Sequence, residues 1–186
     1  TMVANGVVTP GSLPDRPTPK SEWTIGSVAL FRPRKGVEVL IQALSNLRQM
    51  GEVVRLRAVG PFETVEYEET IKEMAARLGV ADMIDWIGFA QNVNAEFAKM
   101  DVLVLPSLFG EGMPMVILEA MAMGVPVVAS DVEGIPEVLQ HAHTGLVVPA
   151  GDAPQLASAL FDLINNKYNW AAMRADAYSL QVKSFS

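Results

Sequence analysis

The chain has 186 residues, half of them hydrophobic, so it is long enough for one sizeable core and too short for two full domains. Its net charge of −7 argues against nucleic acid as a partner, although a local basic patch could still contact a membrane surface peripherally. There is no cysteine, which excludes disulfides and thiolate metal sites. No apolar run reaches the roughly 20 residues of a membrane span and no signal peptide is recognisable, so we expect a cytoplasmic protein.

Residues 1–23 have the composition of an extended linker, with an Asn-Gly turn signal and four closely spaced prolines. From residue 24 to residue 186 we expect a single domain in which strands and helices alternate. The sequence predicts strands at 25–31, 53–59, 83–87, 102–105, 127–129 and 145–148. It predicts helices at 37–50, 65–78, 92–100, 113–123, from 152 onward and at 169–182, with a helical turn near 135–140.

Strands separated by helices of this length predict an α/β fold, a Rossmann-like doubly wound parallel sheet of about six strands. In such a sheet, ligands bind in the crevice at the carboxyl ends of the strands. Asp152, followed three residues later by Gln155, is a capping-box signal for the helix that begins there.

The stretch 102–131 carries the most information about function. It predicts a buried strand that ends at Pro106 and Ser107, a loop with Glu111, an apolar helix with Glu119 and a second buried strand. A carboxylate in an otherwise apolar helix is costly unless something uses it. From the residues alone, Glu111 could equally be a helix-start acid and Glu119 a satisfied buried acid.

Glu111 and Glu119 stand eight positions apart within the block SLFGEGMPMVILEAMAMGVPVVASD. This block resembles the donor site of the retaining GT-B glycosyltransferases of family 4, the group 1 glycosyltransferases, whose E-x7-E motif the two glutamates match. The resemblance covers roughly residues 5–186, and Asn-Gly-Val at 5–7 matches the family's crossing into its C-terminal domain. It implies that the chain is the nucleotide-sugar-binding C-terminal half of a GT-B fold, with the N-terminal acceptor domain absent.

The resemblance also implies roles for single residues. Glu111 is expected at the sugar and the reaction centre, and Glu119 at the ribose hydroxyls. Lys35 is expected to contact the donor diphosphate and, with Glu111, to be catalytic. The family usually carries an arginine five residues before this lysine, where the chain has Leu30, and Arg32 could supply the missing charge.

The remaining donor-binding candidates lie in loops that follow predicted strands. They are Gly60, Phe89, Ala90, Gly112, Met113, Pro114 and Met115. A glycine after a strand allows close backbone approach to a ligand, and amides at a helix start can face a sugar and its distal phosphate. From the residues alone, these loops and the basic loop 32–36 could instead be exposed turns.

No metal-ligand cluster is visible in the sequence. His141 and His143 are the only histidines, and they have no third ligand in sight. The resemblance implies a metal-independent site, so we expect no cofactor and a nucleotide-diphosphate-sugar, UDP- or GDP-linked, as the substrate.

The expected function is therefore donor binding for the transfer of a hexosyl group to a glycan, lipid or small-molecule acceptor. The acceptor would bind through the absent half, and the isolated domain would transfer little or no sugar because domain closure assembles such sites. Two alternatives stay open, a non-catalytic nucleotide-sugar-binding module and a GT-B-like nucleotide-sugar epimerase. A receiver-like module is disfavoured, because Asp101 and Asp131 do not form an acidic cluster at strand ends.

Overall fold

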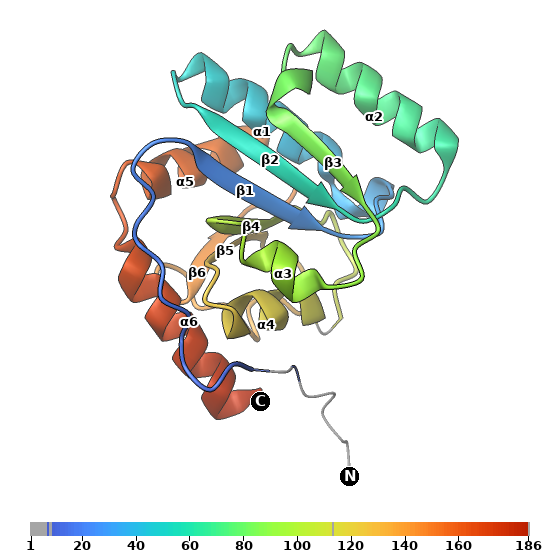
Figure 1. The fold of residues 1–186 in the computed structure, drawn as a ribbon. Coiled ribbons are helices and arrows are strands. Elements are labelled where there is room, and N and C mark those ends of the chain that lie inside the picture. The colour runs from blue at the N-terminus through green and yellow to red at the C-terminus, as the bar shows by residue number, and fades with distance from the viewer. Residues whose placement is uncertain (1–6, 8, 113, 186) are drawn as a thin grey trace.

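The computed structural model describes residues 7, 9–112 and 114–185, which form a parallel sheet with helices on both faces (Figure 1). The strands are β1 (Trp23–Val28), β2 (Val54–Val59), β3 (Ile84–Gly88), β4 (Val102–Leu105), β5 (Val127–Ser130) and β6 (Gly145–Val148). Their order across the sheet is β3-β2-β1-β4-β5-β6, and all pairings are parallel. The predicted Rossmann-like doubly wound sheet is confirmed.

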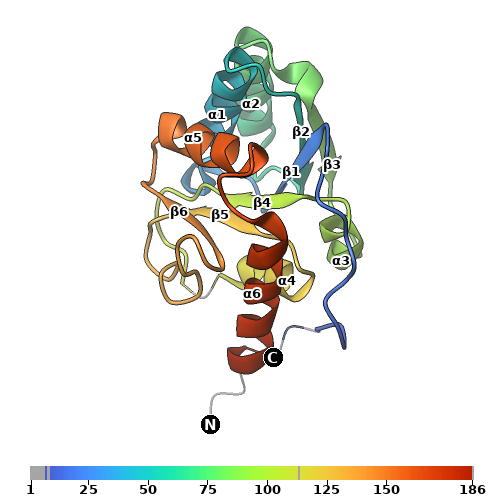
Figure 2. The same ribbon diagram turned by 90° about the vertical axis from the view of Figure 1, so that its left-hand side faces the viewer.

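Two layers of helices cover the sheet. The helices are α1 (Val37–Gln49), α2 (Val65–Arg77), α3 (Val93–Phe97), α4 (Met115–Ala122), α5 (Ala153–Ile164) and α6 (Trp170–Ser184), with short 3₁₀ helices at Pro33–Lys35 and Ala81–Met83. Helices α1, α2 and α5 pack on one face, and α3, α4 and α6 pack on the other (Figures 1 and 2). Because helices cover both faces, the central strands β4 and β5 are buried throughout and read as continuous apolar runs.

Local sequence explains where most helices begin. The side chains of Thr64, Asn92, Asp152 and Asn169 each accept a hydrogen bond from the amide three residues later. These caps satisfy amides that have no partner inside the helix. The predicted cap at Asp152 is therefore confirmed, with the amide of Gln155 as donor at 2.9 Å.

Two elements differ from their predicted ranges in ways that affect the carboxyl edge of the sheet. The first strand was predicted at 25–31 but covers Trp23–Val28, because Phe31 leaves the strand and packs its ring against Phe62 and Trp86. Helix α4 was predicted from 113 but begins at Met115. Pro114 has a non-helical ψ of 83° and precedes the helix, so its carbonyl is the first acceptor.

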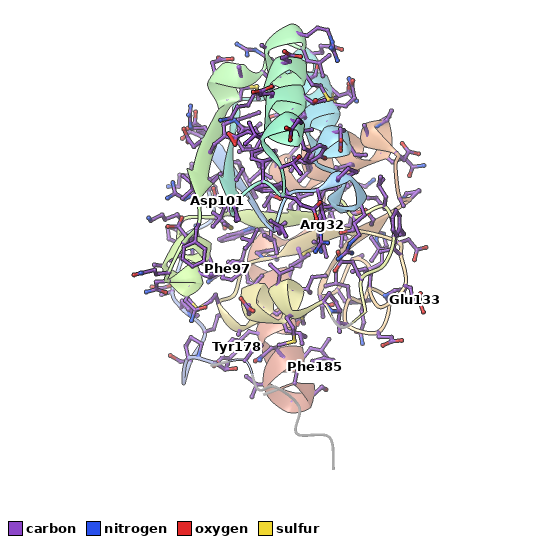
Figure 3. All side chains as sticks on the ribbon, turned by 90° about the vertical axis from the view of Figure 1, so that its right-hand side faces the viewer. Arg32, Phe97, Asp101, Glu133, Tyr178 and Phe185 are labelled. Carbon is purple, nitrogen blue, oxygen red and sulfur yellow. The ribbon has the colours of Figure 1, made fainter. Side chains whose placement is uncertain are left out.

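The strand order marks the place at which a ligand would be expected to bind. From β1 the chain continues to β2 and β3 on one side, and from β4 it continues to β5 and β6 on the other. The loops that follow β1 and β4 therefore diverge at a topological switch point, where open α/β sheets bind ligands. Figure 3 looks at this carboxyl edge, with Arg32 near its middle.

The described part of the N-terminal segment lies along helix α6, as Figures 1 and 2 show. Tyr178 of α6 donates a hydrogen bond to the carbonyl of Pro10, and Arg174 donates to the carbonyl of Pro14. Among the described helices, none combines the length and apolar character needed to cross a bilayer.

Candidate functional site

The loops after β1, β2 and β3 are joined by backbone hydrogen bonds. The amide of Phe31 donates to the carbonyl of Pro61 at 2.9 Å, and the amide of Gly60 donates to Gly88 at 2.7 Å. Below them, the rings of Phe31 and Phe62 pack with centroids 5.4 Å apart. These three loops thus form one continuous hydrogen-bonded edge, which we call the rim.

The fourth predicted loop, between β4 and α4, is held against the loop after β1. The amide of Leu108 donates to the carbonyl of Arg34 at 2.8 Å, and the Arg34 guanidinium donates to the carbonyl of Gly110 at 2.9 Å. Gly36 has φ +70°, and a Cβ there would stand 2.0 Å from the carbonyl oxygen of Pro106. Only glycine fits this backbone approach, which sets the spacing of the two loops.

The closest contact between the two loops joins the two residues expected to be catalytic. Lys35 Nζ lies 2.6 Å from Glu111 Oε1. Both side chains are largely buried, with 16% of Lys35 and 8% of Glu111 exposed. Ser107, fully buried, donates its hydroxyl proton to the same Glu111 oxygen. No described residue donates a hydrogen bond to the other carboxylate oxygen.

Glu111 therefore does not act as a helix-start acid in this structure. It precedes α4 by four positions, and its described partners are Lys35 and Ser107 rather than the first amides of the helix. The pairing brings together a cation and a carboxylate that are 76 residues apart in the chain.

Arg32 lies at the same edge but is paired elsewhere. Its guanidinium approaches Glu63, with Nη1 and Oε1 3.8 Å apart, and its buried Nε has no hydrogen-bond partner among the described residues. Leu30, at the position of the usual family arginine, is 39% exposed. The structure thus leaves one N–H group of Arg32 without an acceptor. Its contact with a phosphate of the nucleotide sugar stays a prediction.

Glu119 lies on α4, partly buried and surrounded by apolar residues. No described residue donates a hydrogen bond or forms an ion pair with it, and burial raises the pKa of its carboxyl above the ordinary value. The described residues therefore give no support to the alternative of a satisfied buried acid. Its expected contact with ribose hydroxyls stays a prediction.

The other predicted donor contacts lie on the rim. Gly60 has φ +126°, and a Cβ there would stand 1.8 Å from the carbonyl oxygen of Ala29, so loop packing alone already requires glycine. The side chain of Phe89 is 77% exposed, whereas Ala90 is partly buried against the core. The expected part of these residues in donor binding stays a prediction.

The start of helix α4 faces the fourth loop. Gly112 is exposed, Pro114 is buried and Met115 is the first helical residue, whereas Met113 lies outside the described residues. A helix leaves its first amides without intrahelical acceptors, so the amides of Met115 and Val116 are free to bind an anion.

The described residues include no cluster of three His, Asp or Glu side chains that could hold a metal ion. His141 Nδ1 accepts a hydrogen bond from the amide of Val147 at 3.0 Å, so this histidine fixes the turn before β6.

Two residues of the site were not predicted from the sequence. Ser107 was expected only to end a strand, and Arg34 was treated as part of a basic turn. The available signal for Ser107 was its place directly after a buried strand, four positions before Glu111. Nothing in the local sequence indicates that Arg34 binds a carbonyl 76 residues away.

Comparisons with known proteins bear on the family of this chain. The family model of the glycosyl transferases group 1 matches residues 12–179. A phosphatidyl-myo-inositol mannosyltransferase of Mycobacterium leprae is 36% identical over 149 residues, which are 76% of this chain and 38% of that protein. A GDP-mannose-dependent phosphatidylinositol monomannoside mannosyltransferase of Mycobacterium tuberculosis is 34% identical over 82% of this chain and 41% of its own length.

Among solved structures, the Anabaena protein HepE in complex with UDP-glucose matches with a TM-score of 0.83 and 26% identity, over 89% of this chain and 45% of that one. The chain spans less than half the length of the curated relatives it matches. The family model covers most of the chain, which confirms the predicted resemblance to the group 1 glycosyltransferases. This chain belongs to the group 1 glycosyl transferases.

Proposed function

We propose that this chain binds the nucleotide-diphosphate-sugar donor of a retaining, family 4 glycosyltransferase that moves a hexosyl group to a glycan, lipid or small-molecule acceptor. The observation that carries the proposal is the contact of Lys35 with Glu111 at the switch point of the sheet, in a chain of this family. The match to a structure that contains UDP-glucose and to a relative described as GDP-mannose-dependent supports a UDP- or GDP-sugar.

The reaction breaks the bond between the sugar and the diphosphate. Negative charge grows on the departing diphosphate, where Lys35, Arg32 and the backbone amides of Gly112 and Met115 can stabilise it, whereas Pro114 has no N–H to donate. The sugar becomes positively charged as the bond breaks, and the carboxylate of Glu111 favours that charge. Glu119 accepts hydrogen bonds from the ribose hydroxyls. No step in this scheme requires a metal ion.

We further expect the acceptor to bind through a second domain, so that this chain alone binds the donor but transfers little sugar. A cytoplasmic location, in reach of the pool of nucleotide sugars, stays a prediction. The alternatives of a non-catalytic binding module and of an epimerase would show donor binding without glycosyl transfer by the full-length protein.

The test is calorimetric titration with UDP, GDP and ADP, each with and without an attached hexose. Selective binding of one nucleotide, reduced at least about tenfold in Lys35→Ala and Glu119→Ala, would support the proposal. Lys72→Ala is a matched control, because Lys72 forms an exposed pair with Glu68 on α2. Equal losses in all three variants, or no nucleotide binding by either this chain or the full-length protein, would contradict it.

A further inference from the structure

We propose that Ser107 is a positioning residue of this site, whose buried hydroxyl holds one carboxylate oxygen of Glu111 so that the other faces the donor sugar. The inference rests on the proposed function, because it assumes that Glu111 acts at the sugar. Ser107 belongs to none of the predicted donor contacts.

Burial shows that Ser107 acts through another residue. Counted over the whole residue, its relative exposure is 0%, whereas that of Glu111 is 7%. Of the two, only Glu111 has exposed surface that a ligand could contact. A buried hydroxyl needs a partner, and this one donates to Glu111 Oε1.

The hydrogen bonds at Glu111 are unevenly distributed over its two oxygens. Ser107 Oγ and Lys35 Nζ both donate to Oε1, and no described residue donates to Oε2. An ionised carboxylate accepts at both oxygens, so Oε2 is the one left for a ligand hydroxyl or a positively charged carbon. Two donors on one side fix the plane of the carboxylate.

Ser107 becomes more important when the donor binds. Lys35 has three N–H groups on a flexible chain, and a diphosphate will compete with Glu111 for them. If Lys35 turns toward the phosphates, Ser107 is the remaining described group that holds Oε1. The short serine side chain has one rotatable bond, so it cannot follow the ligand.

The backbone around Ser107 is itself fixed by the loop after β1. The carbonyl of Pro106 packs against Gly36, and the amide of Leu108 donates to the carbonyl of Arg34 at 2.8 Å. Both neighbours of Ser107 are thus held by the same loop that carries Lys35. The hydroxyl has a defined place before any ligand arrives, which is what a positioning group requires.

The first experiment measures binding of UDP, UDP-glucose, GDP and GDP-mannose to Ser107→Ala by titration calorimetry. We expect the affinity for the preferred nucleotide sugar to fall about tenfold, while the affinity for its nucleotide alone changes less than about twofold. A purely structural role of Ser107 would lower both affinities equally. Equal losses, or no loss for the nucleotide sugar, would overturn the proposal.

Ser130→Ala is the matched control. Ser130 is also a buried serine at the carboxyl end of a strand, but its hydroxyl lies 3.4 Å from the carbonyl of Leu105 and does not reach Glu111. We expect this variant to keep the wild-type ratio of the two affinities. A ratio that changes as much as in Ser107→Ala would mean that any buried hydroxyl at this edge has the effect, and would overturn the proposal.

The second experiment needs no ligand. Crystal structures of the wild-type chain and of Ser107→Ala are compared at Glu111. The proposal expects the carboxylate to rotate or to occupy more than one conformer in the variant, and an unchanged carboxylate would overturn it. If the wild-type protein binds no nucleotide at all, the proposed function fails, whereas this comparison still decides whether Ser107 positions Glu111.

Discussion

At the scale of single residues, the contact of Lys35 with Glu111 limits how the site can attract a diphosphate. Two opposite charges 2.6 Å apart largely cancel, so the pair offers an anion little net attraction. Until a diphosphate draws Lys35 away from Glu111, the attraction comes from groups around the pair, namely the unused Nε of Arg32 and the first amides of α4. If Glu111 acts at the sugar as proposed, its pairing with Lys35 should weaken the binding of the nucleotide part.

A first prediction follows for Glu111→Gln. The substitution frees the charge of Lys35, so the affinity for UDP or GDP alone should rise about fivefold, equivalent to about 1 kcal/mol. The advantage of the sugar-linked nucleotide should shrink at the same time. Titration calorimetry at low and high salt measures both effects, and the gain should decrease with salt. Glu68→Gln, on the exposed face of α2, is the control, and a loss of nucleotide affinity in Glu111→Gln would contradict the argument.

Glu119 gives a second prediction, on stability against pH. Burial raises its folded-state pKa above the ordinary 4.5, so its ionisation opposes folding. The free energy of unfolding is therefore not reduced by Glu119 below the unfolded-state pKa of its carboxyl. It decreases as the pH rises through the folded-state pKa, because the buried carboxyl must then ionise. Glu119→Gln should therefore raise the melting temperature at pH 7, with no gain below about pH 4.

Thermal unfolding of both proteins between pH 3.5 and 7.5 measures this difference. Glu69→Gln, at an exposed position of α2, should show no comparable change with pH. If Glu119→Gln lowered the melting temperature at neutral pH, Glu119 would have a stabilising partner in the folded protein. That result would contradict the inference that its carboxylate is unpaired and available to a ligand.

At the scale of elements, the site depends on two loops from opposite sides of the switch point. The loop after β1 and the loop after β4 share two hydrogen bonds through Arg34 and one close backbone approach at Gly36. These contacts place Lys35 beside Glu111 before any ligand is present.

A third prediction separates backbone strain from loop spacing. Gly36→Ala must accept a left-handed φ of +70° and a clash with the Pro106 carbonyl, whereas Gly51→Ala at φ +85° meets no atom within 4 Å. We expect about 1 kcal/mol of destabilisation for Gly51→Ala and about 3 kcal/mol or more for Gly36→Ala. Urea unfolding measures both, and only Gly36→Ala should weaken nucleotide binding. Equal costs would show that the loops are not held by this contact.

The elements were largely predictable, and their ends and mutual contacts were not. Apolar runs and helical periodicity located all six strands and the flanking helices, because burial on both faces leaves a strong pattern. The start of α4 was missed by two residues, since the backbone of Pro114 is set by its local turn. The roles of Glu111 and Lys35 were suggested by a resemblance, but their direct contact spans 76 residues and depends on strand order.

At the scale of the whole molecule, a buried arginine makes two of the hydrogen bonds that hold the N-terminal segment on helix α6, beside that of Tyr178 to Pro10. Arg174 is 4% exposed and donates from all three of its nitrogens to carbonyl oxygens, those of Gly124, Pro14 and Arg16. Its guanidinium also stacks over Trp170, 5.0 Å from the ring centroid. No described carboxylate pairs with it, so burial lowers the pKa of Arg174.

A fourth prediction tests this connection with Arg174→Met, which keeps much of the side-chain volume and removes every donor. Three carbonyl groups, two in the N-terminal segment and one after α4, lose their partner, so we expect a loss of about 2–4 kcal/mol and a melting temperature lower by roughly 5–15 °C. Release of the segment should also speed trypsin cleavage after the exposed Lys20. Arg77→Met on the exposed face of α2 is the control and should melt close to the wild-type temperature.

The two readouts separate global from local effects of Arg174→Met. Faster cleavage at Lys20 with an unchanged melting temperature would mean that the segment lies on a domain that is stable without it. A lower melting temperature with unchanged cleavage would mean that Arg174 mainly supports the packing of α6 at Gly124. Both changes together are expected, because the guanidinium of Arg174 on α6 bonds to the N-terminal segment and to the turn after α4. No other described residue bonds to both.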